Sequence, residues 1–220
     1  QQMLLQLEQV HKWDIVIIGG GATGLGTAVD AASRGYKTLL VEQYDFAKGS
    51  SGRSTKLIHG GVRYLAQGNI KLVRESLRER GLLLKNAPHV CHDIEFMLPA
   101  FRWWEKWYYG VGLKLYDLLS GNLSLGNTKI LSKKTAKQLL PVINSEKLNG
   151  AVLYYDGQFD DSRLAITLAQ TAAEQGAAII NYCKLITLIK SGKQISGVVI
   201  TDTFSGKEYS LFWRRAVNER

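Results

Sequence analysis

A glycine-rich turn between two apolar runs constrains this chain more than any other feature of its sequence. Residues 14–42 read DIVIIGGGATGLGTAVDAASRGYKTLLVE. The periodicity predicts a strand at Ile15–Ile18, a helix that runs to Arg34, and a second strand at Lys37–Val41. The segment Gly19-x-Gly21-x-x-Gly24 joins the first strand to the helix, which is the arrangement of a nucleotide-binding βαβ unit.

Each glycine of this motif has its own physical role. Gly19 allows a sharp turn, Gly21 lets the backbone approach a pyrophosphate, and Gly24 lets the helix pack closely on the strand. A diphosphate would bind at the start of the helix, where unpaired N–H groups and the positive end of the dipole favour an anion.

Glu42 completes the motif at the end of the second predicted strand. Its carboxylate is suited to accept both hydroxyls of an adenosine ribose, and it would repel a 2′-phosphate. The residues therefore predict a dinucleotide site. They leave NAD and FAD open, because the motif serves both.

A polar loop with the sequence KGSSGRSTK, residues 48–56, follows the βαβ unit. A chain that leaves the second strand passes back over the carboxyl ends of the strands, where the cofactor binds. Five residues are suited to bind phosphate oxygens there: Ser50, Ser51, Ser54, Thr55 and Lys56. The alternative is a solvated surface loop.

The composition is that of an ordinary globular protein with an excess of positive charge. The 220 residues are 45% hydrophobic, enough for one large or two small domains, and carry a formal net charge of +9. This charge favours a phosphorylated metabolite, an anionic membrane surface or nucleic acid as partner. Nucleic acid is disfavoured because the basic residues are scattered and form no known binding pattern.

The cysteines and histidines indicate neither a disulfide framework nor a metal centre. Cys91 and Cys183 are far apart, which fits reduced packing thiols in a cytosolic protein. His89, Cys91 and His92 lie close in sequence but do not have a zinc spacing, so no metal site is expected. The chain also lacks an apolar run of the roughly 18 residues that a membrane span needs.

Residues 52–65 read GRSTKLIHGGVRYL, and this segment makes the prediction of function more specific. After a Gly-x-Gly-x-x-Gly and a terminal Glu, this segment resembles the FAD-dependent glycerol-3-phosphate dehydrogenase family. The resemblance continues through RESLRERGLLLKNAPH and YYDGQFDDSRL and covers the chain from Asp14 to about Asn218. One departure is Gly52, where the family more often has a third serine. The resemblance implies FAD, not NAD.

The resemblance also implies roles for individual residues. Gly19, Gly21, Gly24 and Glu42 would bind the adenosine diphosphate part of FAD, and Ser50, Ser51, Ser54, Thr55 and Lys56 would run beside the pyrophosphate and ribityl chain. His59 would stand near the flavin ring, while Arg63 and Tyr64 would face the substrate. An arginine fork suits a phosphate dianion. His59 is the candidate general base; the alternatives are a flavin-positioning histidine and a core histidine.

We expect an α/β fold: a Rossmann-like FAD-binding domain with a parallel sheet plus a β-meander, and part of a second substrate-covering region. The predicted parts are an N-terminal lead, 1–13; a discontinuous FAD-binding domain, 14–90 and 150–218; and part of the cap, 91–149. Strands are expected at Ile94–Pro99, Ala151–Tyr155, Ala178–Tyr182, Leu185–Lys190, Ile195–Thr201 and Glu208–Trp213, and helices at Asn69–Lys85 and Ser162–Gln175. The first helix is expected to pack on the cofactor domain.

Phe101–Leu119, FRWWEKWYYGVGLKLYDLL, mixes aromatic residues with Lys and Arg. This composition fits core or subunit packing, and it also fits a helix that lies in a membrane interface. Core or subunit packing is the favoured interpretation, and the family's use of membrane quinone adds weight to the second one. We expect a cytoplasmic location, and we leave open peripheral contact with the inner face of the cell membrane and a homodimer.

The expected activity is oxidation of sn-glycerol 3-phosphate to dihydroxyacetone phosphate, with hydride transfer to the flavin and electrons passed to quinone. Oxygen as acceptor stays open. One alternative is an FAD oxidase of an amino or hydroxy acid, in which Arg63 and Tyr64 hold a carboxylate. Another is a non-catalytic nucleotide-binding module. In the family the next strand reads Val-Asn-Ala-Thr-Gly, whereas here Val217 and Asn218 are followed by Glu219 and Arg220, so we expect an N-terminal fragment or a truncated homologue.

Overall fold

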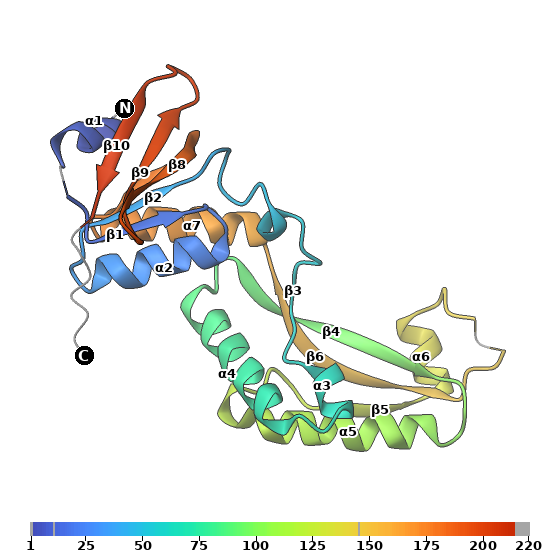
Figure 1. The fold of residues 1–220 in the computed structure, drawn as a ribbon. Helices are drawn as coiled ribbons and strands as arrows, with labels where there is room; N and C mark the ends of the chain where they lie inside the picture. Colours follow the sequence, from blue (N-terminus) through green and yellow to red (C-terminus); the bar gives the residue numbers. More distant parts are fainter. Residues whose placement is uncertain (1, 11, 145, 214–220) are drawn as a thin grey trace. The chain divides into compact units, whose positions relative to one another are not determined.

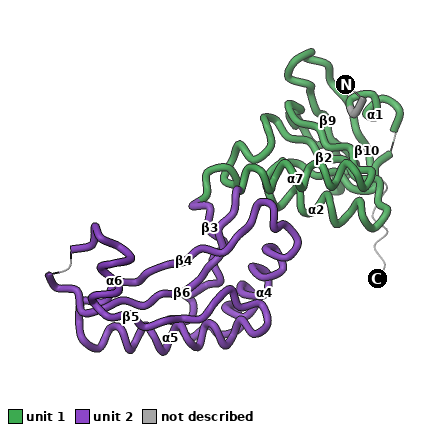
Figure 2. Tube along the Cα trace, turned by 180° about the vertical axis from the view of Figure 1, so that it is seen from behind, with its two compact units in different colours: residues 1–54, 161–220 green, residues 55–160 purple. Residues whose placement is uncertain are grey.

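The computed structural model describes residues 2–10, 12–144 and 146–213. The chain folds into two compact units, residues 1–54 with 161–220 and residues 55–160 (Figure 2). Each unit is described by itself below. The predicted strand start at Val217 and Asn218 lies outside the described residues.

Unit 1 contains a parallel sheet with helices on one face and a β-meander on the other (Figure 1). Its elements are α1 (Gln2–Gln9), β1 (Ile15–Ile18), α2 (Ala22–Ser33), β2 (Thr38–Val41), η1 (Ser50–Gly52), α7 (Asp161–Glu174), β7 (Ala178–Ile180), β8 (Cys183–Ser191), β9 (Gln194–Asp202) and β10 (Glu208–Phe212). The parallel sheet has the order β1-β2-β7, and β8, β9 and β10 form the meander. The predicted α/β fold, with its parallel sheet and meander, is confirmed.

Strand β2 lies at the centre of this unit and is buried along its whole length. Leu39 and Val41 face the core shared with the meander, which includes Val198 and Ile200. Leu40 faces the opposite core, where α2 and α7 pack on the sheet through alanine side chains. The side chains of β2 therefore pack against both layers, the meander on one face and the helices on the other, because successive side chains of a strand point to opposite faces.

Strand β1 forms the edge of the parallel sheet among the described strands, since it pairs with β2 alone. Its sequence, Ile-Val-Ile-Ile, is the continuous apolar run of a strand buried on both faces. The structure nevertheless leaves its four residues only half-buried or exposed, and Ile18 is 51% exposed.

The turn from β1 into α2 depends on the absence of a side chain at Gly24. A Cβ atom built there would lie 2.1 Å from the Gly19 carbonyl oxygen and 3.4 Å from a methyl group of Ile17. Gly19 itself has φ +114°, a backbone conformation that glycine adopts at low cost. The packing and turning roles predicted for Gly24 and Gly19 therefore have a direct structural basis.

Unit 2 is an antiparallel sheet packed against helices (Figure 1). Its elements are β3 (Leu57–Ile58), α3 (Val62–Ala66), α4 (Ile70–Asn86), β4 (Cys91–Ala100), α5 (Glu105–Ser120), η2 (Gly121–Leu123), β5 (Lys129–Ser132), α6 (Lys133–Leu139) and β6 (Gly150–Phe159). The long strands β4 and β6 pair over ten residues. On the other side of β6, β3 pairs with one end and β5 with the other.

Two small cores hold unit 2 together. Val73 and Leu77 of α4 pack with Tyr116 of α5, and all three are nearly inaccessible. A second core joins Ala136 of α6 to Ala151 of β6. Helix α4 begins at Asn69, whose side chain accepts a hydrogen bond from the Leu72 amide, an ordinary N-cap.

The compact units do not coincide with the predicted domains, 14–90 with 150–218 against 91–149. Residues 55–90 and 150–160 group with the predicted cap region because β3, β4 and β6 share one sheet. For the same reason α4, expected to pack on the cofactor domain, packs on α5 and β4 within unit 2. Strand β5 was not among the strands predicted from the sequence.

The described part of the chain contains no helix with the length and apolar character needed to cross a bilayer.

We predict opposite effects for alanine at two glycines of α2. Gly24→Ala should lower the free energy of unfolding by about 1–3 kcal/mol, because the new methyl group forces the helix away from the Gly19 carbonyl. Gly26 has open space around it, so Gly26→Ala should stabilise by up to about 1 kcal/mol through helix propensity. Urea unfolding followed by circular dichroism measures both. Equal stability of the two variants would contradict the packing role of Gly24.

Candidate cofactor and substrate site

The first turn of α2 presents its backbone to solvent. Gly21 is the N-cap residue and makes no side-chain cap, and Ala22 and Thr23 are exposed. The Ala22 amide donates a hydrogen bond to Ser51 Oγ at 3.0 Å, and a Cβ on Gly21 would lie 3.1 Å from the same oxygen. The structure thus brings Ser51, predicted as a phosphate ligand, to the predicted pyrophosphate turn. The Ser51 hydroxyl oxygen therefore already accepts a hydrogen bond from the helix N-terminus at the predicted position of a phosphate oxygen.

Glu42 is tied to the same turn by its carboxylate. Oε2 accepts a hydrogen bond from the Gly20 amide at 2.7 Å, and Oε1 accepts one from the Tyr44 amide at 2.8 Å. Gly20 is crowded as well, since a Cβ there would lie 2.7 Å from the Phe46 ring and 2.9 Å from Glu42 Cβ. Glu42 therefore organises the turn, and Gly20 is a required glycine that the motif-based reading did not identify.

The polar loop after β2 is anchored by a buried aspartate. Ser54 Oγ donates to Asp161 Oδ2 at 2.7 Å, while Asp161 Oδ1 accepts from the Ser162 amide at 2.8 Å. Asp161 is the first residue of α7 and is only 3% exposed. Ser50 and Ser51 form the short helix η1 in this loop. The hydroxyl hydrogen of Ser54 is thus committed to Asp161, to which the sequence analysis assigned no site role.

The structure explains why position 52 departs from the serine of the resembling family. A Cβ at Gly52 would lie 2.4 Å from the Ala47 carbonyl oxygen. Ala47 has φ +60°, which turns its carbonyl into this space. A serine here would require the backbone around Ala47 to move.

The remaining predicted residues belong to unit 2. Thr55 and Lys56 lead into β3, and the Lys56 carbonyl accepts a hydrogen bond from the Phe159 amide at 3.0 Å. His59 follows β3 directly, and its side chain is 61% exposed. Arg63 and Tyr64 lie on the short helix α3, both exposed. These five residues are all exposed and lie within one short stretch of chain, 55–64, in which Gly60 and Gly61 are buried.

A buried polar cluster lies beneath that stretch. Asp156 of β6 pairs with Arg80 of α4, Nη1 to Oδ1 at 3.0 Å, and both side chains are 3% exposed or less. The Gly60 amide donates to the same carboxylate oxygen at 3.2 Å. The Tyr116 hydroxyl lies 3.5 Å from each carboxylate oxygen. Burial, with the nearby Asp156 carboxylate, raises the pKa of Tyr116, so the phenol stays neutral and donates.

Sequence reasoning missed this cluster, although a signal was present. Arg80 stands three residues after Leu77 on the apolar stripe of α4, where a charged residue needs a buried partner. Asp156 follows the apolar run of β6. Neither position indicates the other, because 76 residues separate them.

The cysteines are packing residues in the structure. Cys91 and Cys183 are buried and free. Burial raises the pKa of Cys91, and burial together with Asp202 raises that of Cys183 to about 11, so both thiols stay protonated near neutral pH. Within the described residues, His, Cys, Asp and Glu side chains do not gather into a group of three that could hold a metal ion.

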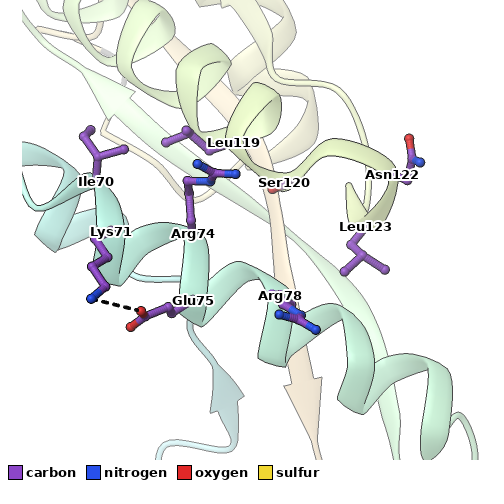
Figure 3. A pocket seen from close by; sticks show the side chains of 9 residues that line it. All are labelled: Ile70, Lys71, Arg74, Glu75, Arg78, Leu119, Ser120, Asn122 and Leu123. Atoms are coloured by element: carbon purple, nitrogen blue, oxygen red, sulfur yellow. Dashed lines mark ion pairs between the residues drawn. The ribbon is translucent and has the colours of Figure 1, made fainter.

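Unit 2 also carries a surface groove of about 730 Å³ between α4 and the end of α5 (Figure 3). Arg74 extends from α4 toward Leu119, and Lys71 pairs with Glu75 at 4.0 Å. Arg78 and Asn122 line the rest of the groove. None of the residues predicted to bind cofactor or substrate lies in it.

Comparisons with known proteins agree with this geometry. The family model described as FAD dependent oxidoreductase matches residues 14–217. The chain is 45% identical to human mitochondrial glycerol-3-phosphate dehydrogenase over 99% of its own length and 32% of the relative's. It is 40% identical to the mitochondrial glycerol-3-phosphate dehydrogenase of Schizosaccharomyces pombe, covering 99% of this chain and 35% of that one. The chain thus spans about a third of the length of these curated relatives.

Solved structures share the fold. The X-ray structure of glycerol-3-phosphate dehydrogenase from Bacillus halodurans, complexed with FAD, matches with a TM-score of 0.72 and 29% identity over 96% of this chain and 34% of that chain. L-proline dehydrogenase from P. horikoshii has the same fold, with a TM-score of 0.69 and 20% identity over 92% of this chain and 51% of that chain. With a family model that matches nearly its whole length and a glycine turn built as that fold requires, this chain belongs to the family of FAD-dependent oxidoreductases.

Proposed function

We propose that the protein to which this chain belongs oxidises sn-glycerol 3-phosphate to dihydroxyacetone phosphate, with FAD as hydride acceptor and membrane quinone as the final acceptor of electrons. The observation that carries the proposal is the exposure of the His59, Arg63 and Tyr64 side chains on a short segment that follows an FAD-type glycine turn in the chain. The 45% identity to a human glycerol-3-phosphate dehydrogenase supports the choice of substrate. Since the chain spans about a third of such relatives, the activity is proposed for the whole protein.

The residues of unit 1 fit the diphosphate of FAD. The start of α2 is exposed, lacks a side-chain cap and has glycine at each position where a Cβ would crowd the turn. The Ala22 amide already donates to a hydroxyl oxygen, so it is oriented to donate to a phosphate oxygen. Gly19, Gly21 and Gly24 would shape this cradle. Ser50, Ser51 and Ser54, followed by Thr55 and Lys56, would line the diphosphate and ribityl chain.

Glu42 would bind the adenosine ribose. Each carboxylate oxygen has two acceptor sites, and a backbone amide uses one of them at Oε1 and at Oε2. The second site of each oxygen is available for a ribose hydroxyl. The two amides also hold the carboxylate in one orientation, which reduces the entropy lost when the nucleotide binds.

Arg63, Tyr64 and His59 would handle the substrate. The Arg63 guanidinium offers a planar pair of N–H donors to a phosphate dianion, and Tyr64 next to it offers a hydroxyl. Bound FAD supplies the acceptor for the hydride that leaves carbon 2 with its electron pair. The His59 imidazole would take the proton of the 2-hydroxyl group, and the carbon–oxygen bond becomes the ketone of dihydroxyacetone phosphate.

We also propose peripheral membrane contact through α5. Tyr116 and Leu113 fill the buried side of this helix. Its other side carries exposed apolar residues at helical spacing: Trp104, Tyr108, Val111, Leu115 and Leu118. Apolar side chains exposed on the side of a helix opposite its buried face are not suited to water. Aromatic residues with Lys106 and Lys114 suit an anionic interface, and quinone is a membrane substrate. The cytoplasmic side and a homodimer stay predictions.

The first test concerns Glu42 and FAD. In Glu42→Gln one of the two backbone amides would face a side-chain NH₂ group, so the turn should loosen and FAD affinity should fall about tenfold or more. Quenching of flavin fluorescence during titration measures the affinity. Glu174→Gln, an exposed substitution at the end of α7, is the matched control. Equal FAD affinities of the Glu42→Gln and Glu174→Gln variants would contradict a role of Glu42 in FAD binding.

The second test concerns Arg63 and the substrate phosphate in the full-length enzyme. Arg63→Ala should raise the KM for glycerol 3-phosphate about tenfold or more and leave the flavin absorption spectrum unchanged. Arg74→Ala, an exposed arginine in the neighbouring groove, should leave KM unchanged. Turnover of amino or hydroxy acids in place of glycerol 3-phosphate would overturn the proposed function.

The third test concerns α5 and lipid. The full-length protein should sediment with vesicles that contain phosphatidylglycerol, and the double substitution Trp107→Ser with Leu118→Ser should weaken the binding about tenfold or more. Val142→Ser with Phe204→Ser removes apolar residues of similar exposure outside α5 and should have little effect. If both pairs behave alike, α5 is not the contact surface.

A further inference from the structure

The carboxylate of Asp156 is the most strongly held charged group of unit 2. Its Oδ1 accepts hydrogen bonds from Arg80 Nη1 at 3.0 Å, the Gly157 amide at 3.1 Å and the Gly60 amide at 3.2 Å. Its side chain is 3% exposed and that of Arg80 is 2% exposed. A buried carboxylate requires such compensation, and here three donors converge on one oxygen.

The second carboxylate oxygen faces His59. Oδ2 lies 3.7 Å from His59 Nδ1, an ion-pair separation about 0.7 Å longer than a typical hydrogen bond. Hydrogen bonds of this kind are often long in ligand-free sites and shorten when the site fills. The His59 side chain is 61% exposed, so one edge of the ring faces a buried carboxylate and the rest is open to solvent.

The backbone beside His59 is fixed by the same cluster. A Cβ at Gly60 would lie 2.0 Å from the Tyr116 hydroxyl and 2.4 Å from Leu77, so Gly60 sits directly on the core of unit 2. Gly61 then turns the chain with φ +87° into α3, which carries Arg63. Asp156 therefore accepts a hydrogen bond from the amide that follows His59 and faces the His59 ring across 3.7 Å.

We propose that Asp156, clamped by Arg80, is a positioning residue for His59: it accepts the Nδ1–H of the neutral ring and leaves Nε2 as the proton acceptor. The inference rests on the proposed function only for the identity of the proton that Nε2 receives. The orientation itself is a property of unit 2.

The donors around Asp156 determine what an amide in its place would do. Oδ1 is surrounded by three N–H donors, so in Asp156→Asn the amide oxygen stays at that position. The NH₂ group then occupies the position of Oδ2 and points at His59 Nδ1. A donor at this place forces Nδ1 to accept, and the proton of the neutral ring moves to Nε2.

The charged and titratable groups that face this arrangement come from three elements. Arg80 approaches from α4, Tyr116 from α5 and Asp156 from β6. Tyr116 stays neutral because burial raises its pKa, and its hydroxyl can donate to the carboxylate or accept from the substituted amide. The isosteric substitution Asp156→Asn therefore places an N–H donor at the position of Oδ2 and removes the negative charge opposite Arg80.

The experiment measures the His59 tautomer directly. Long-range ¹H–¹⁵N correlation spectra of the full-length protein labelled with ¹⁵N-histidine show the histidine rings, and the signal absent from His59→Gln identifies His59. Spectra are recorded at about pH 9, well above the ordinary histidine pKa, so that a neutral ring is observed. The wild type should show the Nδ1–H tautomer and Asp156→Asn the Nε2–H tautomer.

Glu79→Gln is the matched control, because it removes one exposed negative charge next to Arg80 in the chain and should leave the tautomer as in the wild type. A wild-type ring in the Nε2–H form overturns the proposal, and so does an unchanged tautomer in Asp156→Asn. The wild-type spectrum decides alone if Asp156→Asn does not fold. A purely structural Arg80–Asp156 pair would not reverse the tautomer.

A second measurement separates this inference from the proposed function. In the full-length enzyme with FAD, Asp156→Asn should lower kcat for glycerol 3-phosphate about 100-fold or more, with KM little changed. If the tautomer reverses and kcat does not change, Asp156 positions His59 as proposed and His59 is not the base. If the tautomer is unchanged, the positioning role fails whatever the activity.

Discussion

The closeness of α2 to β1 is the constraint on which unit 1 depends. The helix can begin where it does because Gly24 has no side chain to meet the Gly19 carbonyl. This approach places the exposed amide of Ala22 beside Ser51, and it sets Gly20 against Glu42. The position of α2 therefore determines the contacts of the glycine turn, of Glu42 and of the serine loop. A shift of this helix by the width of a methyl group would disturb all three.

Local patterns predicted unit 1 well. The first strand was predicted at the residues where it occurs, and the strands predicted at Leu185–Lys190, Ile195–Thr201 and Glu208–Trp213 overlap β8, β9 and β10. These elements depend on neighbours a few residues away: apolar alternation, glycine where φ is positive, and an acid at a strand end. The order β1-β2-β7 also follows from a pattern, since parallel strands need a crossover helix.

Long-range pairing was harder to predict. Local patterns do not indicate that β4 pairs with β6 over ten residues, so the predicted domains separate these two strands, which the compact units group together. The same limit applies to the candidate site. Single residues such as His59 and Glu42 could be named from a motif and a resemblance, whereas the partnership of Arg80 with Asp156, or of Ser54 with Asp161, joins residues distant in the chain. Only the fold brings them together.

The free side of β1 has a consequence for how this chain behaves in a test tube. Among the described residues β1 pairs with β2 alone, so the other row of its amides and carbonyls can serve as a template onto which another extended segment adds. Ile18 at the end of β1 is about half exposed and adds an apolar side chain to this edge. We therefore expect the isolated chain to self-associate in solution by strand addition at β1. A segment that paired with this edge would extend the sheet and prevent that association.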